Sequence, residues 1–234
     1  LKTFYNNLEI TRYLQKDHNY NFIFLTFTIR NVWGPELGSA LDEINKAINR
    51  LYLRPEWKKA VKGACRCLEV THNVKKSSEW YNSFHPHVHF MVAVNKSYFT
   101  SRAYLTQKKW ADLWASVMHI DYEPHVYVEK CYGSMEKAVA ECSKYSVKDA
   151  EYIIPEEWDL TVETVKLLDE VLANRRLISY SGCFKVARAA LKLEDEETGS
   201  LVNVGEPGEE NTEKDYIIQT YYWYSGYRQY VSIN

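Results

Sequence analysis

One run of residues that carries two histidines constrains the fold more than any other part of the sequence. Residues 87–94 are His-Val-His-Phe-Met-Val-Ala-Val, a stretch dominated by residues that favour β-strands. Side chains on a strand point to its two faces in alternation, so His87 and His89 share one face while Val88 points to the other. The run therefore predicts a strand that presents two imidazoles on the same face.

Two imidazoles on one face of a rigid strand can bind a divalent metal ion together. For an isolated His-x-His, the alternative is a half-exposed pair on a sheet surface, because short metal motifs also arise by chance. Glu69 offers a third ligand, since it lies in the stretch 64–71, which predicts the preceding strand. Sequential strands often pair, and pairing would let the Glu69 carboxylate face His87 and His89. The alternative is an exposed strand carboxylate, because the sequence does not fix the register.

Two imidazoles and one carboxylate with open coordination positions suit Mn²⁺ or Mg²⁺ in phosphate chemistry, and they also accept Zn²⁺. His85 and His72 are further candidate ligands. Pro86 disrupts regular strand pairing just before the histidine pair, which can turn His85 away from the shared face. We expect the pair and Glu69 to form the metal site.

The order of predicted elements indicates the fold class. Periodic and β-branched segments predict strands and helices in the order strand, helix, strand, strand, helix, strand, helix. Their approximate ranges are 22–30, 36–59, 64–71, 86–94, 106–118, 122–131 and 135–148. This order is typical of an α+β fold in which helices pack on one face of an antiparallel sheet, with a ferredoxin-like or RNA-recognition-like core.

The second half of the chain predicts three further parts. We expect a catalytic core over residues 1–155. A helical extension follows over 156–193, with a helix near 162–174. Residues 175–191 look partly helical. The range 194–215 is rich in Asp and Glu and predicts an acidic linker or loop, and 216–234 is an aromatic, β-like tail.

Composition narrows the class of protein. A net charge of -2 argues against a general nucleic-acid coat protein, although not against an enzyme with one basic face, and residues 50–76 are rich in Arg and Lys. The 5 cysteines show no paired Cys-x-x-Cys spacing, which favours reduced thiols in a cytoplasmic protein. No apolar run approaches the ~20 residues of a membrane span, so no membrane partner is expected.

A second group of reactive side chains lies in the predicted helix 135–148. Glu141 precedes Tyr145 by four residues and Lys148 follows it by three, so the three side chains share one helical face. A phenol is a poor nucleophile near neutral pH unless a base, cation or metal assists it. Lys148 could lower the free-energy cost of deprotonating the phenol or hold a phosphate oxygen, and Glu141 could orient or deprotonate a water. The alternative is a solvated ion pair beside one of 19 tyrosines.

Three blocks in this order resemble the replication initiators of rolling-circle plasmids, within the endonucleases defined by a His-hydrophobic-His motif and a catalytic tyrosine. Residues 24–28 resemble the first motif of that family, a hydrophobic strand that ends in Thr. Residues 85–89 resemble its metal motif. Residues 141–148 resemble its third motif, Tyr-x-x-Lys, in the branch where a glutamate precedes the tyrosine by four residues. The resemblance covers roughly residues 22–190.

The resemblance implies a metal-dependent, site-specific DNA endonuclease and strand transferase. Tyr145 would attack single-stranded origin DNA and leave a 5′-phosphotyrosine and a free 3′-hydroxyl that primes synthesis, with Lys148 assisting. Glu141 would support hydrolysis at termination. The implied partners are the double-strand origin of a plasmid, cleaved as a single strand, and a host helicase, because the sequence lacks a Walker-type phosphate-binding run. The implied location is the cytoplasm of a bacterial host.

Two alternatives remain at the level of the sequence. Conjugative relaxases and single-strand transposases share the histidine pair and the tyrosine, and relaxases commonly use a third histidine, for which His85 or His72 is available. The glutamate before Tyr145 favours the plasmid initiator. The other alternative is a non-catalytic binder that stacks bases of single-stranded nucleic acid on aromatic residues of its sheet.

Overall fold

The computed structural model describes residues 2–131, 138–140, 142–143, 152–154, 156–193, 220–224 and 229–233. The chain divides into two compact units, residues 1–193 and residues 194–234. The predicted catalytic residues Glu141, Tyr145 and Lys148 lie outside the described residues, as does the acidic stretch 194–215. The boundary that the sequence places after residue 155 stays a prediction.

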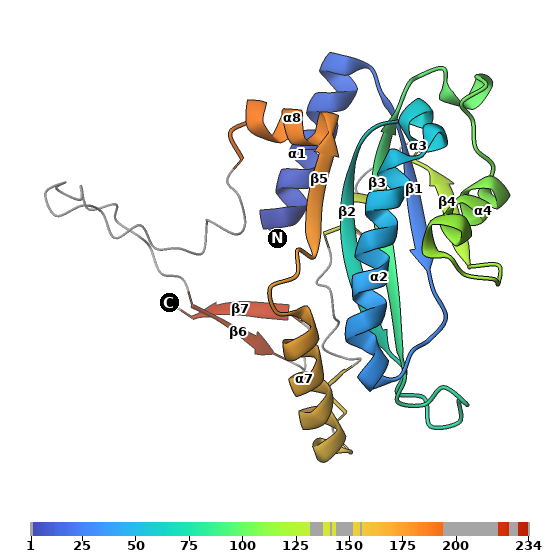
Figure 1. The fold of residues 1–234 in the computed structure, drawn as a ribbon. Helices are drawn as coiled ribbons and strands as arrows, with labels where there is room; N and C mark the ends of the chain where they lie inside the picture. Colours follow the sequence, from blue (N-terminus) through green and yellow to red (C-terminus); the bar gives the residue numbers. More distant parts are fainter. Residues whose placement is uncertain are drawn as a thin grey trace, which may run out of the picture. The chain divides into compact units, whose positions relative to one another are not determined.

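A five-stranded antiparallel sheet forms the centre of the first unit, with the strand order β4-β1-β3-β2-β5 (Figure 1). The strands are β1 (Asn21–Thr28), β2 (Val61–His72), β3 (Phe84–Val94), β4 (Val126–Lys130) and β5 (Ile178–Gly182). The predicted histidine-bearing strand is β3, which pairs with β1 on one side and β2 on the other. The α+β class with an antiparallel sheet is therefore confirmed.

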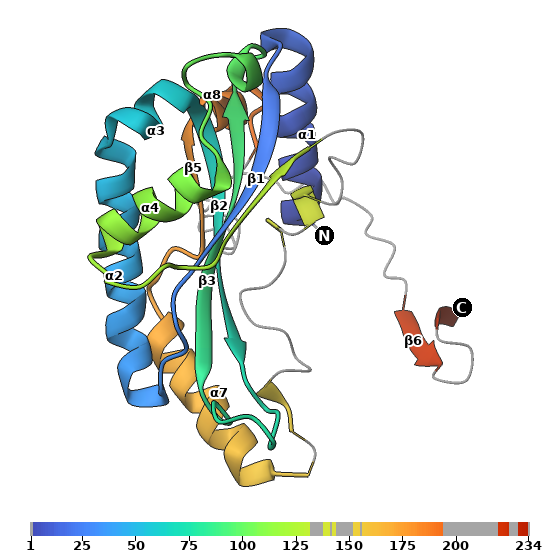
Figure 2. The same ribbon diagram turned by 90° about the vertical axis from the view of Figure 1, so that its right-hand side faces the viewer.

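Helices α2 (Gly34–Leu53), α3 (Pro55–Ala60) and α4 (Gln107–Met118) cover one face of the sheet (Figure 2). The apolar positions of α2 recur at helical spacing and are buried, and α4 buries Trp110 and Trp114 against the same core. Pro55 stands at the first position of α3 and separates it from α2, because proline has no backbone N–H to donate to the preceding helical turn. Helix α7 (Trp158–Leu172) adds Leu168 to this core.

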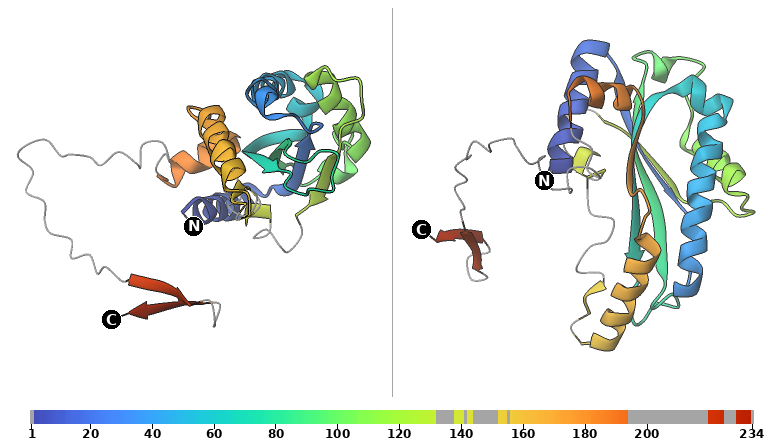
Figure 3. Two further views of the ribbon diagram at one scale, coloured as in Figure 1. Left: turned by 90° about the horizontal axis from the view of Figure 1, so that it is seen from below. Right: turned by 60° about the vertical axis from the view of Figure 1, so that its left-hand side comes forward.

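Helices also cover part of the opposite face, which corrects the expectation that helices pack on one face only. There, α1 (Lys2–His18) and α8 (Cys183–Ala190) enclose a second apolar cluster with Phe22, Phe24 and Met91 of the sheet (Figure 3). These strand residues alternate with those that face α2, and they are as apolar. A strand that is apolar on both faces must be covered on both faces. Helix α1 covers the face opposite to α2 with Leu8, Ile10 and Leu14.

The segment expected to be partly helical begins with a strand. β5 pairs with the start of β2, and α8 follows it directly. Gly182 has a φ of 54° and faces Gly63 across the pair, where a side-chain carbon on Gly182 would lie 2.2 Å from the Lys62 carbonyl oxygen. Only glycine fits both the backbone conformation and the close approach.

The remaining described elements are short. A 3-10 helix, η1 (Tyr98–Thr100), follows β3. In the second unit, β6 (Thr220–Tyr224) and β7 (Gln229–Ile233) pair antiparallel within the predicted β-like tail. None of the described helices has both the length and the apolar character that crossing a membrane requires.

Gly182→Ala should lower the free energy of unfolding by about 1–3 kcal/mol, because alanine is strained at positive φ and its Cβ meets backbone. Gly38→Ala, inside α2 with its nearest neighbour at 3.7 Å, should instead raise it by about 0.4–1 kcal/mol. Urea unfolding followed by near-ultraviolet circular dichroism measures both. Equal stability of the two variants would contradict the close contact between β2 and β5.

Candidate metal centre

The register of β2 and β3 determines which side chains meet. Glu69 is the direct partner of His87, and Cys67 is the direct partner of His89. Directly opposed residues of an antiparallel pair project on the same face, with neighbouring Cβ atoms. Glu69 and both histidines therefore share the face that is opposite to α2, as the sequence predicts.

The three side chains converge. Glu69 Oε2 lies 3.3 Å from His87 Nε2 and 3.0 Å from His89 Nε2. One potential ligand atom from each residue lies within 4.8 Å of the other two. Glu69 and His89 are buried, while His87 keeps 13% of its side chain exposed. These residues could hold a metal ion, with His87 on the solvent side where a substrate can enter.

Partners on the far side of each ring aim the two Nε2 atoms at Glu69. His87 Nδ1 lies 3.1 Å from the carbonyl oxygen of His85. A carbonyl only accepts, so Nδ1 of His87 is the donor in this contact and Nε2 is the atom that faces Glu69. His89 Nδ1 lies 2.9 Å from Thr26 Oγ1, and the ring of Phe24 stacks on His89 with centroids 5.4 Å apart. Such partners fix the tautomer and orientation of metal-binding histidines.

The chemistry of the donor set fits a divalent cation. Glu69 Oε2 lies within hydrogen-bond distance of His89 Nε2, and in a metal-bound form a cation would replace the proton between the ring nitrogens and the carboxylate oxygen. A carboxylate that is 2% exposed also requires hydrogen bonds or positive charge. Two imidazoles and one carboxylate form an open set of three ligands, which leaves positions for water or a phosphate oxygen.

The two further histidines have different positions. His72 is paired with Phe84 and faces away from Glu69, with its Nε2 at 2.9 Å from Asn82 Oδ1. His85 shares the face of His87, and their ring centroids are 5.6 Å apart, so Pro86 does not turn His85 off that face. Burial lowers the pKa of His85, and a charge on His87 lowers it further. His85 contributes its carbonyl oxygen to the centre, while its ring lies outside the cluster of three.

The segment that contains the predicted nucleophile is described only in part. Residues 138–140 are helical, as expected, and Ala138, Val139 and Cys142 belong to the apolar cluster of Phe24 and Met91. This is the sheet face of the metal centre, because Phe24 stacks on His89. Cys142, which follows position 141, thus packs on the sheet face that carries the centre. The roles of Glu141, Tyr145 and Lys148 stay predictions.

Cys65, Cys67, Cys131, Cys142 and Cys183 are all free thiols, as the spacing of the cysteines predicts. Burial raises the pKa of Cys131 to about 12 and that of Cys183 to about 11, so both remain protonated at neutral pH. A protonated thiol is a weak metal ligand and a weak nucleophile. Cys67, although opposite His89, donates toward the Leu68 carbonyl oxygen at 3.8 Å and is not part of the cluster.

Thr26 is a residue whose place in the centre the sequence did not reveal. It stands opposite His89 across β1 and β3. The available signal is the alternation of residues 22–28, which places Thr26 and Thr28 on the same face as the apolar Phe22 and Phe24. Only the register of β1 against β3 identifies Thr26, rather than Thr28, as the partner of His89 Nδ1.

Comparison with known proteins identifies the family to which this chain belongs. Residues 2–231 match the model of a family described as "Replication protein". The chain belongs to this family. Among its curated relatives, Protein rep of Bacillus amyloliquefaciens is 32% identical over 99% of this chain and 71% of its own length. The replication protein of Staphylococcus aureus is 31% identical over 86% of this chain and 87% of its own length.

Protein rep of Lactiplantibacillus plantarum is 37% identical over 79% of this chain and 59% of its own length. No solved structure matches the chain. Membership confirms the resemblance to replication initiators, while the branch with a glutamate before the tyrosine stays a prediction. Within this family, a buried group of one carboxylate and two imidazoles is a candidate for the reactive site.

Removal of a metal-binding side chain should abolish the stabilisation of the fold by Mn²⁺. Mn²⁺ at about 100 times its dissociation constant should stabilise the wild-type protein by about 2.7 kcal/mol. His89→Ala and Glu69→Gln should show little of this stabilisation, and Thr26→Val should bind Mn²⁺ about 10–100-fold more weakly, because His89 loses the partner that orients it. Thermal unfolding with and without Mn²⁺ measures the effect.

His18→Ala is the matched control, because His18 is exposed at the end of α1. It should respond to Mn²⁺ as the wild-type protein does. Undiminished stabilisation of a His87→Ala, His89→Ala double variant would show that the metal binds elsewhere.

Proposed function

We propose that this replication protein initiates rolling-circle replication of a plasmid by nicking one strand of the origin. The observation that supports the proposal most is the convergence of Glu69, His87 and His89 on one face of the sheet. Membership of the replication protein family supports a role in replication, and the donor set supports chemistry at a phosphate. The protein would act in the cytoplasm of a bacterial host.

The proposed cofactor is Mn²⁺ or Mg²⁺, held by His87, His89 and Glu69. When bound, such an ion supplies positive charge beside the scissile phosphate and favours displacement at phosphorus. The Thr26 hydroxyl, the His85 carbonyl oxygen and the Phe24 ring keep the two imidazoles in place before any substrate arrives. A preorganised centre spends little free energy on reorganisation during the reaction.

Tyr145 is the proposed nucleophile. Its phenol oxygen forms a bond to phosphorus while the bond from phosphorus to the 3′ oxygen breaks, and the departing oxygen takes up a proton to become a free 3′-hydroxyl. Lys148 favours the phenolate form or holds a phosphate oxygen. The 5′-phosphotyrosine keeps the energy of the broken phosphodiester bond for later rejoining, whereas attack by water would lose it.

Glu141 is proposed to act at termination. After one round of synthesis the origin is regenerated, and a water activated by Glu141 cleaves it in place of a second tyrosine. The products are a 5′-phosphate and a 3′-hydroxyl, and no second protein–DNA bond forms. The packing of Val139 and Cys142 on the sheet face that carries the metal centre supports a role for this segment there.

The proposed substrate is origin DNA in single-stranded form. Tyr127 of the edge strand β4, opposite Thr26, is 44% exposed on the same face. Aromatic rings of this kind can stack on unpaired bases. A separate host helicase would unwind the duplex, because the chain has no Walker-type run.

Tyr145→Phe should abolish the covalent adduct with DNA, because phenylalanine has no oxygen for the attack. Single-stranded oligonucleotides tiled across the replicon that encodes the chain are labelled at their 3′ ends and incubated with Mn²⁺, and denaturing electrophoresis then separates the protein-linked product. Tyr5→Phe is the control, since Tyr5 is 59% exposed on α1. EDTA should suppress every adduct, and an adduct that persists in Tyr145→Phe would remove this residue from its role.

Glu141→Ala should separate nicking from termination. We expect the first cleavage to proceed within about twofold of the wild-type rate, whereas hydrolytic release should fall about 10²–10⁴-fold, the usual contribution of a general base. The measurement follows single-turnover cleavage and release of the protein from a regenerated origin. Glu163→Ala, an exposed change on α7, should alter neither rate. Unchanged release in Glu141→Ala would overturn the assignment.

A further inference from the structure

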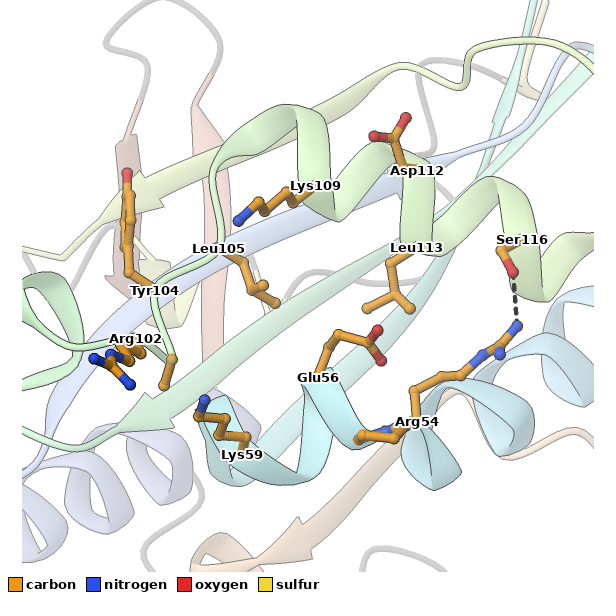
Figure 4. A pocket seen from close by; sticks show the side chains of 12 residues that line it. Arg54, Glu56, Lys59, Arg102, Tyr104, Leu105, Lys109, Asp112, Leu113 and Ser116 are labelled. Atoms are coloured by element: carbon orange, nitrogen blue, oxygen red, sulfur yellow. Dashed lines mark hydrogen bonds between the residues drawn. The ribbon is translucent and has the colours of Figure 1, made fainter.

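A basic pocket lies in the helical layer that covers the other face of the sheet. It has a volume of about 580 Å³ and is lined by the start of α3, by residues 102–105 and by the outer surface of α4 (Figure 4). The metal centre does not contribute to it, because Glu69, His87 and His89 project from the opposite face. The pocket therefore requires an explanation of its own.

The charge of the pocket is positive in a chain whose net charge is -2. Four cations line it: Arg54, Lys59, Arg102 and Lys109. Two carboxylates, Glu56 and Asp112, line it as well. Asp112 is already paired with Lys108, whose ammonium lies 3.1 Å from Asp112 Oδ1 and which is not part of the lining. One carboxylate is thus left for four cations.

The cations are also unevenly placed. The side chains of Lys59, Arg102 and Lys109 reach the end of the pocket beside Tyr104, whereas Arg54 lies at the other end and donates to Ser116 Oγ at 2.6 Å (Figure 4). Across the described part of the chain, no carboxylate lies within 4.0 Å of Lys59, Arg102 or Lys109. Three like charges from three separate segments gather here, and Glu56, the other carboxylate of the lining, lies more than 4.0 Å from each of them.

The frame of this cationic end is rigid and partly apolar. Lys109 stands in the first turn of α4, which the Thr106 side chain caps and which Trp110 and Trp114 anchor in the core. Leu105 and Leu113 form part of the wall. Apolar walls keep the effective dielectric constant low, so cations at the rim attract an anion more strongly than isolated surface lysines do.

We propose that this pocket binds the sugar–phosphate backbone of double-stranded DNA, and this inference rests on the proposed function. Cations from three segments, spread around a pocket that is too large for a single phosphate, match a run of phosphates. Phosphate contacts supply most of the non-specific affinity of proteins for duplex DNA. Tyr104 is the one aromatic residue among the described residues of the lining, whereas binding of unpaired bases depends on several stacking rings.

The placement on the helical face gives the duplex and the nicked strand separate contacts. An origin is double-stranded before it is nicked, so an initiator needs a contact with duplex DNA that does not occupy the reactive face. The basic range 50–76, to which Arg54 and Lys59 belong, thereby acquires a role that the metal centre does not give it.

The test is the salt dependence of duplex binding by a triple variant, Lys59→Ala, Arg102→Ala, Lys109→Ala. The probe is a fluorescent duplex of about 20 base pairs with arbitrary sequence, because backbone contacts carry no sequence information. Each lost phosphate contact should reduce the slope of log affinity against log salt by about 0.9, so the triple variant should lose about 2–3 units of slope. Its affinity at low salt should fall at least tenfold.

The matched control removes the same charge elsewhere, through Lys16→Ala, Lys166→Ala and Lys185→Ala, all exposed positions outside the pocket. It should keep the wild-type slope. Thermal unfolding establishes that both triple variants are folded. Equal slopes for the two triple variants would overturn the inference, as would a loss on a single-stranded probe as large as the loss on the duplex.

Adduct formation on a single-stranded oligonucleotide separates this inference from the proposed function. The pocket variant should form the phosphotyrosine adduct at the wild-type rate, because its three changes leave the metal face intact. If the wild-type protein forms no adduct, the proposed nicking fails, and the duplex slopes still decide whether the pocket binds DNA. If adducts form normally but the slopes agree, only the inference about the pocket fails.

Discussion

The register of β2 against β3 determines whether the candidate metal centre forms. A shift of this register by one residue would move Glu69 to the other face of the sheet. In the observed register, Leu68 and Val88 form a pair that faces the apolar core under α2, while Glu69 and His87 form the next pair on the opposite face. A slip would place the Glu69 carboxylate in that core without compensation, at a cost of several kcal/mol. The hydrophobic pattern of the two strands therefore positions the ligands, even though none of the ligands is hydrophobic.

The same alternation explains what the sequence could predict. The runs in β1, β2 and β3 and the helical periods of α2 and α4 are long and regular, and each was predicted near its observed position. The convergence of Glu69 with the two histidines followed from strand alternation and from pairing of sequential strands. These features depend on short-range patterns, which a single sequence carries well.

The parts that were not predicted depend on contacts between distant segments. The short, half-polar β5 became a strand because Gly182 and Gly63 allow it to approach the start of β2 closely. Helix α1 covers apolar strand residues that the sheet alone would leave exposed, and this need for a cover becomes visible only once the sheet is assembled. Thr26 joined the centre through the register of β1. In each case a second segment, far away in sequence, determines the outcome.

The central position of β3 has a consequence for motion in the site. Its backbone is hydrogen-bonded to β1 and to β2 on either side of both histidines, so the amides of this strand exchange with solvent only when the sheet itself opens. The imidazoles thus belong to the slowest-opening part of the fold. Tyr127, in contrast, lies on β4, which among the described strands pairs with β1 alone. A DNA strand that crosses this face from its edge would contact the more mobile strand β4 first and the rigidly held histidines of β3 last.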